Sequence, residues 1–349
     1  MVKIGEYLDT PTDLPYVADG VQLWGRAIVL LPYFSHESTE WFGFFQHPDK
    51  SLQRVALVDI VSGGFLASAP LKAGQDFYLP LEDLVFQRMS FPGITRPLSG
   101  LEDVIESFAS LLELYEQVSH NCQEKRPGAP QTAQLLVNQL MIVARTAFDV
   151  LQTISREACA TVKRIDDRTK PLMQSLPRKD SFAQVALHKD EPRTPEALMR
   201  KFNMPKPLAD FYNSYAPFLV KIRNIRDGIV HRGHNAGFVF NVDQGLAVLT
   251  KERPWNQLQI WDEGSLTNKN LGSLRKLFAY VISEVIAATS RFGETFASCV
   301  LLPEPLSPGN HVFLRGPLNH HLLKLDETLA SPWERQPAQQ HEYEPEHSQ

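Results

Sequence analysis

Short apolar runs separated by turn residues fill the first hundred positions of the chain. The runs GRAIVLLPYF, EWFGFFQ, RVALVDIVSGGFLAS and DFYLPL are rich in aromatic and β-branched residues, and clusters of Pro, Gly and Asp divide them. Runs of this kind favour strands and turns over long helices. The pattern predicts a β-containing N-terminal domain over residues 1–98.

After residue 98 the apolar positions follow a helical period. Four segments carry apolar residues three or four positions apart, which is the spacing of one helix face. These helices are expected from about residue 99 to a turn at 127–130, from 131 to about 165, along a third stripe that ends near 229, and from about 266 to 296. Four amphipathic helices in succession predict a mainly α fold, with a four-helix bundle over residues 99–298.

The stripes can be read directly from the sequence. The first stripe consists of Leu101, Ile105, Phe108, Leu112 and Tyr115, and the second of Leu136, Leu140, Val143, Ala147, Leu151, Ile154, Ala158 and Val162. The third stripe consists of Leu208, Phe211, Tyr215, Phe218, Ile222, Ile225 and Ile229, and the fourth of Leu271, Leu274, Phe278, Val281, Val285, Thr289 and Phe292.

The segments between and after these helices differ in character. Residues 166–195 contain four prolines among mixed charges and are expected to form a loop, with one short turn at SFAQVAL. The stretch GFVFNVDQGLAVL alternates around Asp-Gln-Gly and predicts a hairpin. Residues 299–349 are rich in Pro and polar side chains, which favours an extended C-terminal segment, disordered from about residue 330.

Composition narrows the class of protein. The chain has 349 residues, 43% of them hydrophobic, and its net charge of -5 gives no overall cationic field. Contact with nucleic acid would therefore need a local basic patch. The N-terminus has no signal-peptide core and no apolar run is long enough to span a membrane, so we expect a cytoplasmic protein with no membrane association.

No metal or cofactor site is expected from the sequence. The three cysteines lie far apart, and no phosphate-binding loop or Ser-His-Asp arrangement occurs. The pair His320–His321 has no matching ligand at an accepted spacing, which favours exposed loop histidines. The segment RGPLNH, Arg315 to His320, is likewise expected to be loop.

A cluster of charged residues ends the third helix in KIRNIRDGIVHRGHNAG, residues 221–237. Helical spacing places Arg226 on the apolar face, where a guanidinium needs a hydrogen-bonding or anionic partner. In a purely structural interpretation, Arg226 pairs with a carboxylate inside the bundle, and His231 and Arg232 complement the C-terminal end of the helix dipole. The alternative is that the cluster is a functional site.

The cluster resembles the motif of the HEPN (higher eukaryotes and prokaryotes nucleotide-binding) domain. That motif is an Arg, usually followed by a polar residue, with a His after four to six intervening residues, and Arg226, Asp227 and His231 match it. The stretch IRDGIVHRG is similar to the iRN…vHRG form of many bacterial members, with Asp227 where Asn is often found. The resemblance covers residues 99–298 and implies a HEPN-like four-helix bundle.

The resemblance implies a metal-independent endoribonuclease that acts as a homodimer on RNA, of a kind that serves as a toxin or defence effector with an antitoxin or sensor partner. His231 would transfer the proton, because imidazole titrates near neutrality. Arg226 would stabilise the phosphorane, and Asp227 would orient either partner. The residues expected to hold flanking phosphates are Arg223, Arg232, Lys221 and His234. The same resemblance allows a non-catalytic dimerisation module that binds a nucleotide or a partner protein.

Overall fold

The fold was analysed in a computed structural model. It describes residues 32–35, 40–46, 52–57, 63–70, 72–89, 92–159, 162–166, 181–231, 239–305 and 307–334. Within these ranges the protein is mainly helical, with a few small sheets. The tail beyond residue 334, where disorder is expected, lies outside the described residues.

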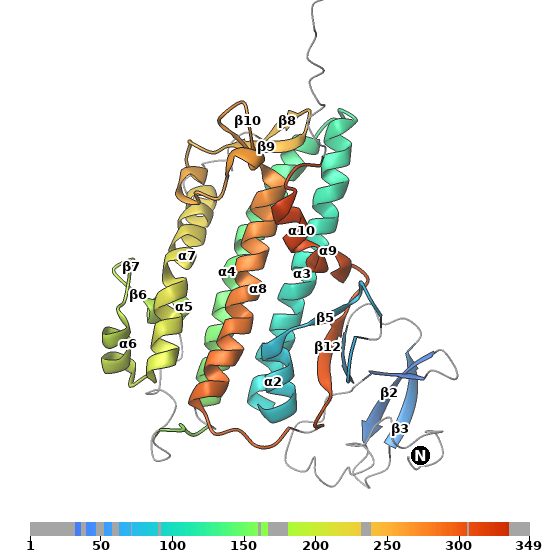
Figure 1. The fold of residues 1–349 in the computed structure, drawn as a ribbon, viewed down its shortest axis with the longest axis vertical. Helices are drawn as coiled ribbons and strands as arrows, with labels where there is room; N and C mark the ends of the chain where they lie inside the picture. The colour runs from blue at the N-terminus through green and yellow to red at the C-terminus, as the bar shows by residue number, and fades with distance from the viewer. Residues whose placement is uncertain are drawn as a thin grey trace, which may run out of the picture.

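Four long helices run alternately up and down along the longest axis of the molecule (Figure 1): α3 (Pro92–Gln123), α4 (Ala129–Cys159), α7 (Lys206–His231) and α8 (Leu274–Cys299). They confirm the four expected helices. All the stripe residues of α3 and of the second expected helix are buried, and so are most of those of α7 and α8. Burial of these stripes is the main driving force that holds the helices together.

Two helix starts differ from the expected ones. Helix α3 begins at Pro92 instead of 99, because a proline is tolerated in the first helical turn, where its missing N–H would have no partner. Helix α8 begins at Leu274 instead of 266, because the Ser273 hydroxyl accepts a hydrogen bond from the Lys276 N–H at 3.2 Å and caps the helix. The residues before it form strands β10 (Leu266–Thr267) and β11 (Leu271–Ser273).

A small antiparallel sheet lies across one end of the helices, in the order β10-β11-β9-β8. Strands β8 (Phe240–Val242) and β9 (Gly245–Leu249) pair with each other and confirm the expected hairpin. Two 3-10 turns, η4 (Trp255–Gln257) and η5 (Glu263–Ser265), complete this cap. The cap connects α7 to α8, so it fixes the distance between the third and fourth long helices.

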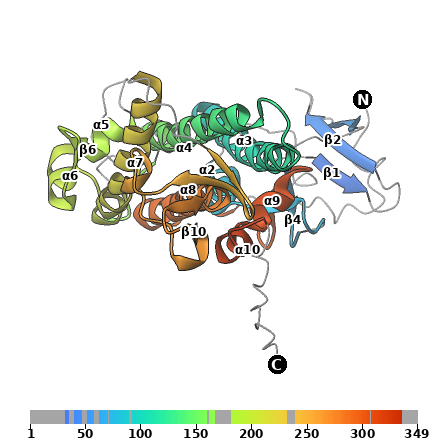
Figure 2. The same ribbon diagram turned by 90° about the horizontal axis from the view of Figure 1, so that it is seen from above.

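The connection between α4 and α7 packs on the outer side of α7, at the opposite flank from the C-terminal helices (Figure 2). It contains α5 (Phe182–Ala186), strands β6 (Leu187–His188) and β7 (Glu191–Pro192), and α6 (Pro195–Phe202). Helix α5 confirms the expected turn at SFAQVAL, and Ser181 and Gln184 form its capping box. The described residues after α5 also differ from the expected loop, because Leu187 and His188 of β6 pair with Pro192 and Glu191 of β7.

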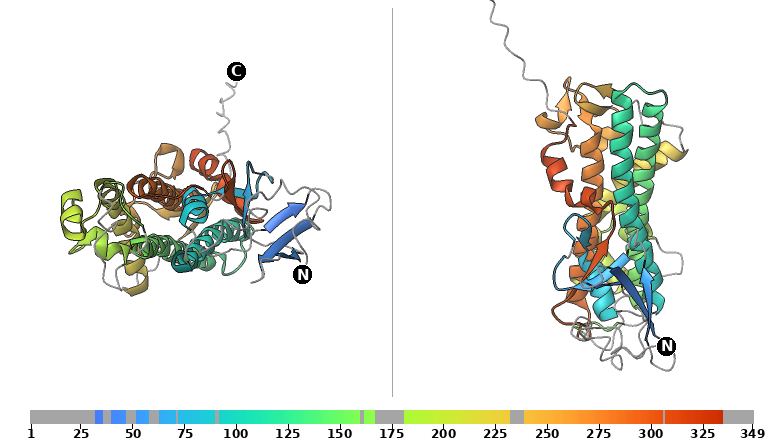
Figure 3. Two further views of the ribbon diagram at one scale, coloured as in Figure 1. Left: turned by 90° about the horizontal axis from the view of Figure 1, so that it is seen from below. Right: turned by 90° about the vertical axis from the view of Figure 1, so that its right-hand side faces the viewer.

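The N-terminal region contains strands and one helix. Strands β1 (Pro32–Ser35), β2 (Glu40–Gln46) and β3 (Leu52–Leu57) form an antiparallel sheet near the end of the bundle away from the cap (Figure 3). Helix α2 (Pro80–Met89) follows β4 (Gly63–Ala67) and β5 (Asp76–Tyr78) and packs on α8. The strands agree with the sequence, whereas α2 was not expected.

The described part of the C-terminal segment, residues 307–334, contains a paired strand and two short helices, which corrects the expectation of an extended segment there. Strand β12 (His311–Arg315) lies between β4 and β5, and α9 (Asn319–Leu323) and α10 (Leu325–Ala330) follow. Arg315 forms a buried ion pair with Asp76, in which Nε lies 2.6 Å from Oδ1 and Nη2 lies 2.8 Å from Oδ2. The segment around Arg315 is therefore a buried strand and not a loop. The sequence alone did not reveal it, because its partner strands lie more than 200 residues earlier.

Two glycines in helix interiors lie in opposite environments and give a matched test of this packing. A Cβ at Gly293 would lie 3.0 Å from the Leu81 Cα and 3.1 Å from the Leu81 N, whereas nothing lies within 4 Å of a Cβ at Gly228. We expect Gly293→Ala to destabilise the protein by about 1–3 kcal/mol through overpacking between α8 and α2. We expect Gly228→Ala to stabilise it by about 0.4–1 kcal/mol. Urea unfolding measures both, and equal effects of the two changes would contradict the close approach of α2 to α8.

Candidate functional site

The C-terminal half of α7 carries two arginines on one side of the helix, both bonded to acids. Arg226 Nε donates to Asp227 Oδ1 at 2.9 Å, and Arg226 Nη2 bonds the same oxygen. Arg223 Nη1 donates to Asp190 Oδ1 at 2.6 Å, and Arg223 Nε lies 3.5 Å from Asp227 Oδ2. Asp227 therefore lies between two guanidinium groups.

Helix α4 adds a third arginine next to this group. Arg145 Nε lies 3.7 Å from Asp149 Oδ2, and the Phe182 N–H donates to Asp149 Oδ1 at 3.2 Å. Burial raises the pKa of the Asp149 carboxyl, although the positive charges of Arg145 and Arg226 act in the opposite direction. We call Arg145, Arg223 and Arg226 the arginine cluster.

Asp227 is the acid most strongly influenced by the arginine cluster. Burial acts to raise the pKa of its carboxyl, but the hydrogen bond from Arg226 and the charges of all three arginines outweigh burial and lower it. Asp227 thus remains ionised to a lower pH than an ordinary aspartate. The expected role of Asp227 in orienting Arg226 agrees with this contact.

The structural interpretation of Arg226 can now be compared with its contacts. The arginine is paired with a carboxylate, as that interpretation requires, but the acid is its neighbour in the chain and not a residue deep inside the bundle. The side chains of Arg226 and Asp227 keep 23% and 31% of their exposure. Arg226 is therefore accessible to a ligand that can compete with Asp227.

The other expected site residues have different positions. His231 is the last residue of α7, and five residues along an α-helix correspond to a rotation of about 140°, so positions 226 and 231 lie on different faces of the helix. Arg232 and His234 lie outside the described residues. Lys221 lies near Glu284 of α8: burial raises the pKa of the Glu284 carboxyl, and the positive charge of Lys221 acts in the opposite direction. Among the expected residues that the structure describes with their side chains, Arg223, Arg226 and Asp227 lie together.

A second group of side chains, which the sequence did not reveal, lies in a cavity of about 340 Å³ between α2, α8 and the segment before β12. Asp83 accepts three hydrogen bonds or polar contacts there, from the Val312 N–H at 2.9 Å, from the Tyr78 hydroxyl at 3.2 Å and from His311 Nδ1 at 2.9 Å. Burial and the Asp83 carboxylate raise the pKa of Tyr78 to about 12. No sequence signal could have indicated this group, because Asp83 and His311 are 228 positions apart.

The carboxyl groups of Glu82 on α2 and Glu102 on α3 lie close together, and Glu82 is buried. Burial and the nearby Glu102 raise the pKa of Glu82 well above its usual value of 4.5. Glu82 therefore keeps its proton to a higher pH than an ordinary glutamate, because ionising both acids would place two like charges close together. This pair couples the packing of α2 on α3 to pH.

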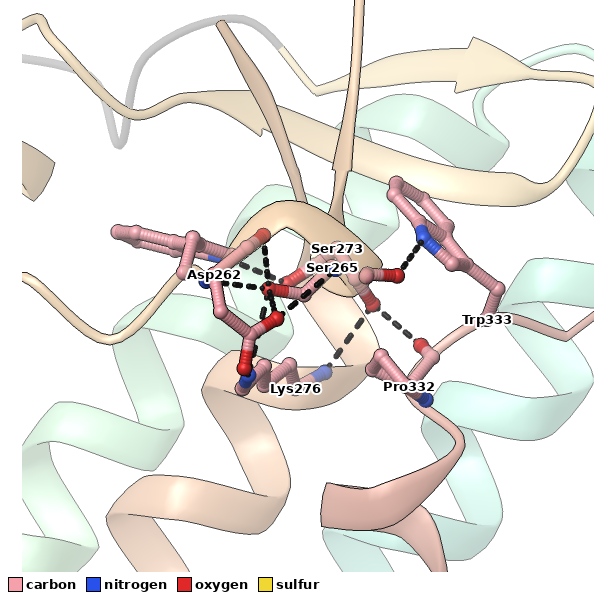
Figure 4. Close-up of polar contacts among 8 residues, drawn as sticks. Asp262, Ser265, Ser273, Lys276, Pro332 and Trp333 are labelled. Atoms are coloured by element: carbon pink, nitrogen blue, oxygen red, sulfur yellow. Dashed lines mark hydrogen bonds and ion pairs between the residues drawn. The ribbon is translucent and has the colours of Figure 1, made fainter. Parts of the chain in front are cut away.

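A third polar group has a structural role. The Lys276 ammonium donates to Asp262 Oδ2 at 2.6 Å and to the Ser265 hydroxyl at 3.2 Å, and Ser265 is fully buried (Figure 4). In the same close-up the Ser273 hydroxyl donates to the Pro332 carbonyl, and Trp333 Nε1 donates to the Gly264 carbonyl at 2.9 Å. These bonds attach residues 332–333 to the cap and to the start of α8, and no substrate could reach Ser265.

No family model, curated protein or solved structure significantly matches this chain. None of the helices in the described ranges combines the length and the apolar character that a bilayer crossing requires. The argument for function therefore rests on the geometry of the side chains themselves.

The Glu82–Glu102 pair predicts a specific pH dependence of stability. A carboxyl whose pKa is raised by folding stabilises the folded state below its unfolded pKa, and this contribution is lost as the pH rises through the folded pKa. Glu82→Gln is a neutral replacement that cannot ionise. Its stability relative to the wild type should therefore increase from pH 5 to pH 8, by at most about 1.4 kcal/mol per pH unit. Urea unfolding at both pH values measures the difference, with the exposed Glu327→Gln as control. A difference that does not change with pH would contradict a raised pKa of Glu82 in the folded protein.

Proposed function

We propose that the protein is a metal-independent endoribonuclease of the HEPN type, which acts on RNA as a homodimer. The observation that carries the proposal is the convergence of Arg145, Arg223 and Arg226 from two helices around Asp227, with Arg226 five positions before His231. Permanently charged, planar guanidinium groups suit the binding of phosphates.

The order of the elements supports the proposal. The resemblance implies four long helices, with the Arg and His residues near the end of the third and a hairpin before the last. Helices α3, α4 and α7, the β8–β9 hairpin and helix α8 follow one another in that order. This agreement concerns the arrangement of elements, and the catalytic assignment depends on the experiments below.

In the proposed reaction, the 2'-hydroxyl of the RNA attacks the adjacent phosphorus and the bond to the 5'-oxygen breaks, which leaves a cyclic phosphate. His231 accepts or donates the proton, since an imidazole titrates near neutral pH. Arg226 leaves Asp227 and stabilises the negative charge on the phosphorane. Arg223, Arg232 and His234 bind flanking phosphates, whereas Lys221 faces Glu284 and is not part of the site we propose.

Helix α4 offers a surface for the second copy. Leu135 and Ile142 are seven positions apart on α4, and they keep 65% and 40% of their exposure. Asp149 continues the same heptad spacing into the arginine cluster. A second copy packed here would cover both apolar residues and would place its own α7 terminus near Arg226.

The first test is cleavage of labelled tRNA and total RNA in EDTA. Arg226→Ala and His231→Ala should each reduce the rate by about 100-fold or more, because each removes a group that acts in the transition state. Both variants should remain folded by circular dichroism. Arg291→Ala, which removes an exposed arginine of α8 paired with Glu294, is the matched control and should cleave normally. Equal cleavage by the wild type and both variants would exclude this site.

The second test asks whether the site is shared between two chains. Leu135→Glu and Ile142→Glu should yield a monomer in light scattering and abolish cleavage, whereas Met199→Glu on α6, which is exposed to a similar degree as Ile142, should remain dimeric. Mixing the Arg226→Ala and His231→Ala chains should restore about one quarter of wild-type activity, because half of the randomly formed dimers carry one intact pair of residues. No recovery on mixing would contradict a site composed of residues from both chains.

A non-catalytic role is the alternative, and one observation favours it. The three arginines are accompanied by Asp149, Asp190 and Asp227, so the described part of the site has no net positive charge. In this case the bundle dimerises, and the cluster of Arg and His residues binds a nucleotide or the carboxylates of a partner. Intact RNA in the cleavage assay, together with retained binding that Arg226→Ala weakens, would support this role.

A further inference from the structure

Four side chains with metal-binding atoms meet where α9 packs on α3. Glu113 and Glu116 lie on α3, and His320 and His321 lie on α9. His321 Nε2 is 2.9 Å from Glu113 Oε2, and His321 Nδ1 is 3.6 Å from Glu116 Oε1. The ligand atoms of Glu113, His320 and His321 all lie within 4.8 Å of one another.

This contact corrects the expectation of two exposed loop histidines. His320 is half-buried and His321 keeps only 7% of its exposure, and both lie on a helix. The matching ligands were missed because they are about 200 positions earlier in the chain, on an amphipathic helix whose acids resemble ordinary surface residues.

From this geometry we propose that Glu113, His320 and His321 bind a divalent transition-metal ion such as Zn²⁺. Two imidazoles and one carboxylate form a donor set that Zn²⁺ accepts, with water at the fourth position. Two ligands of a tetrahedral zinc ion lie about 3.4 Å apart, so the present separations require adjustments of about 1 Å. Half-buried His320 has the freedom to make this movement.

Each proposed ligand has a second partner that orients it. His320 Nδ1 lies 3.1 Å from the Pro317 carbonyl oxygen, which favours the tautomer with a free lone pair on Nε2. His321 Nδ1 faces Glu116, so Nε2 is directed at Glu113. Gln117 Nε2 donates to Glu113 Oε1 at 2.6 Å and leaves Oε2 for the metal. Carboxylate and carbonyl partners behind the ligating histidines are typical of metal sites.

The simplest alternative to a metal site is an ion pair between His321 and Glu113 alone. His320 distinguishes these two interpretations. The His321 pair needs nothing from His320, yet the two imidazole rings lie 3.9 Å apart at an angle of 38° and both have a nitrogen directed to the same small region. Removal of His320 should therefore abolish metal binding while the ion pair remains. This site is independent of the proposed ribonuclease activity.

A metal at this position would attach the C-terminal segment to the core. Helix α9 leads into α10, which packs on α8, and then into residues 331–334, which are bonded to the cap. A ligand that binds only the folded state stabilises it in proportion to the logarithm of its concentration above the dissociation constant. Zinc should therefore raise the melting temperature of the full chain.

The test is equilibrium dialysis of the purified full-length protein, stripped with EDTA, against Zn²⁺. The wild type should bind one ion per chain, with a rise in melting temperature. His320→Ala and Glu113→Gln should each weaken zinc binding by at least about 10–100-fold. Loss of a residue that only orients a metal ligand already has an effect of this size. His188→Ala, which removes an exposed histidine of β6, should bind as the wild type does.

Two results would overturn the proposal. One is the absence of binding at one ion per chain in the wild type. The other is equal binding by the wild type and His320→Ala, which would place the metal elsewhere. Because His320→Ala retains the pair between His321 and Glu113, a folded variant is expected, and its circular dichroism spectrum verifies this.

Discussion

The burial of α8 is the constraint on which the rest of the structure depends. Its buried side chains include Leu277, Phe278, Val281, Ile282 and Phe292, which form a wide apolar face. An apolar face of this width must be covered by more than one neighbouring element. Helices α4 and α7 cover part of it, and α2 and α10 cover the remainder. The segments before and after the four long helices therefore belong to the same core as the helices themselves.

This arrangement explains why distant parts of the chain are joined by buried polar groups. When β12 inserts between β4 and β5, Arg315 is buried and needs the Asp76 carboxylate, since an unpaired buried charge costs several kcal/mol. Lys276, at the start of α8, is matched by Asp262 in the same way. Such pairs add little net stability compared with apolar side chains, but they penalise any arrangement that separates the partners. They help to specify how the C-terminal segment returns to the bundle.

The sequence predicts the parts of this fold that depend on local periodicity. The stripes of α3 and α4, the hairpin at residues 240–249 and the helix at SFAQVAL could be found because each pattern lies within one element. The contact of Arg226 with Asp227 could also be found, because the two are neighbours. Strand β12, the Asp83–His311 contact and the Glu113–His321 contact could not, because each joins residues more than 200 positions apart. A short segment such as 311–323, with Gly and Pro in its middle, resembles a loop until its partners are known.

The charge balance at the arginine cluster decides which kind of anion it can bind. Three guanidinium groups and three carboxylates give no net attraction for a small anion, which would have to displace Asp227 while gaining only one contact. A polyanion gains several phosphate contacts in one binding event and releases its own counterions, so it can offset the loss of the internal ion pairs. Two copies of the cluster in one cleft would double those contacts and hold them at a fixed spacing. In the proposed ribonuclease, the internal carboxylates would then disfavour simple salts and would leave a long phosphate backbone as the favoured ligand.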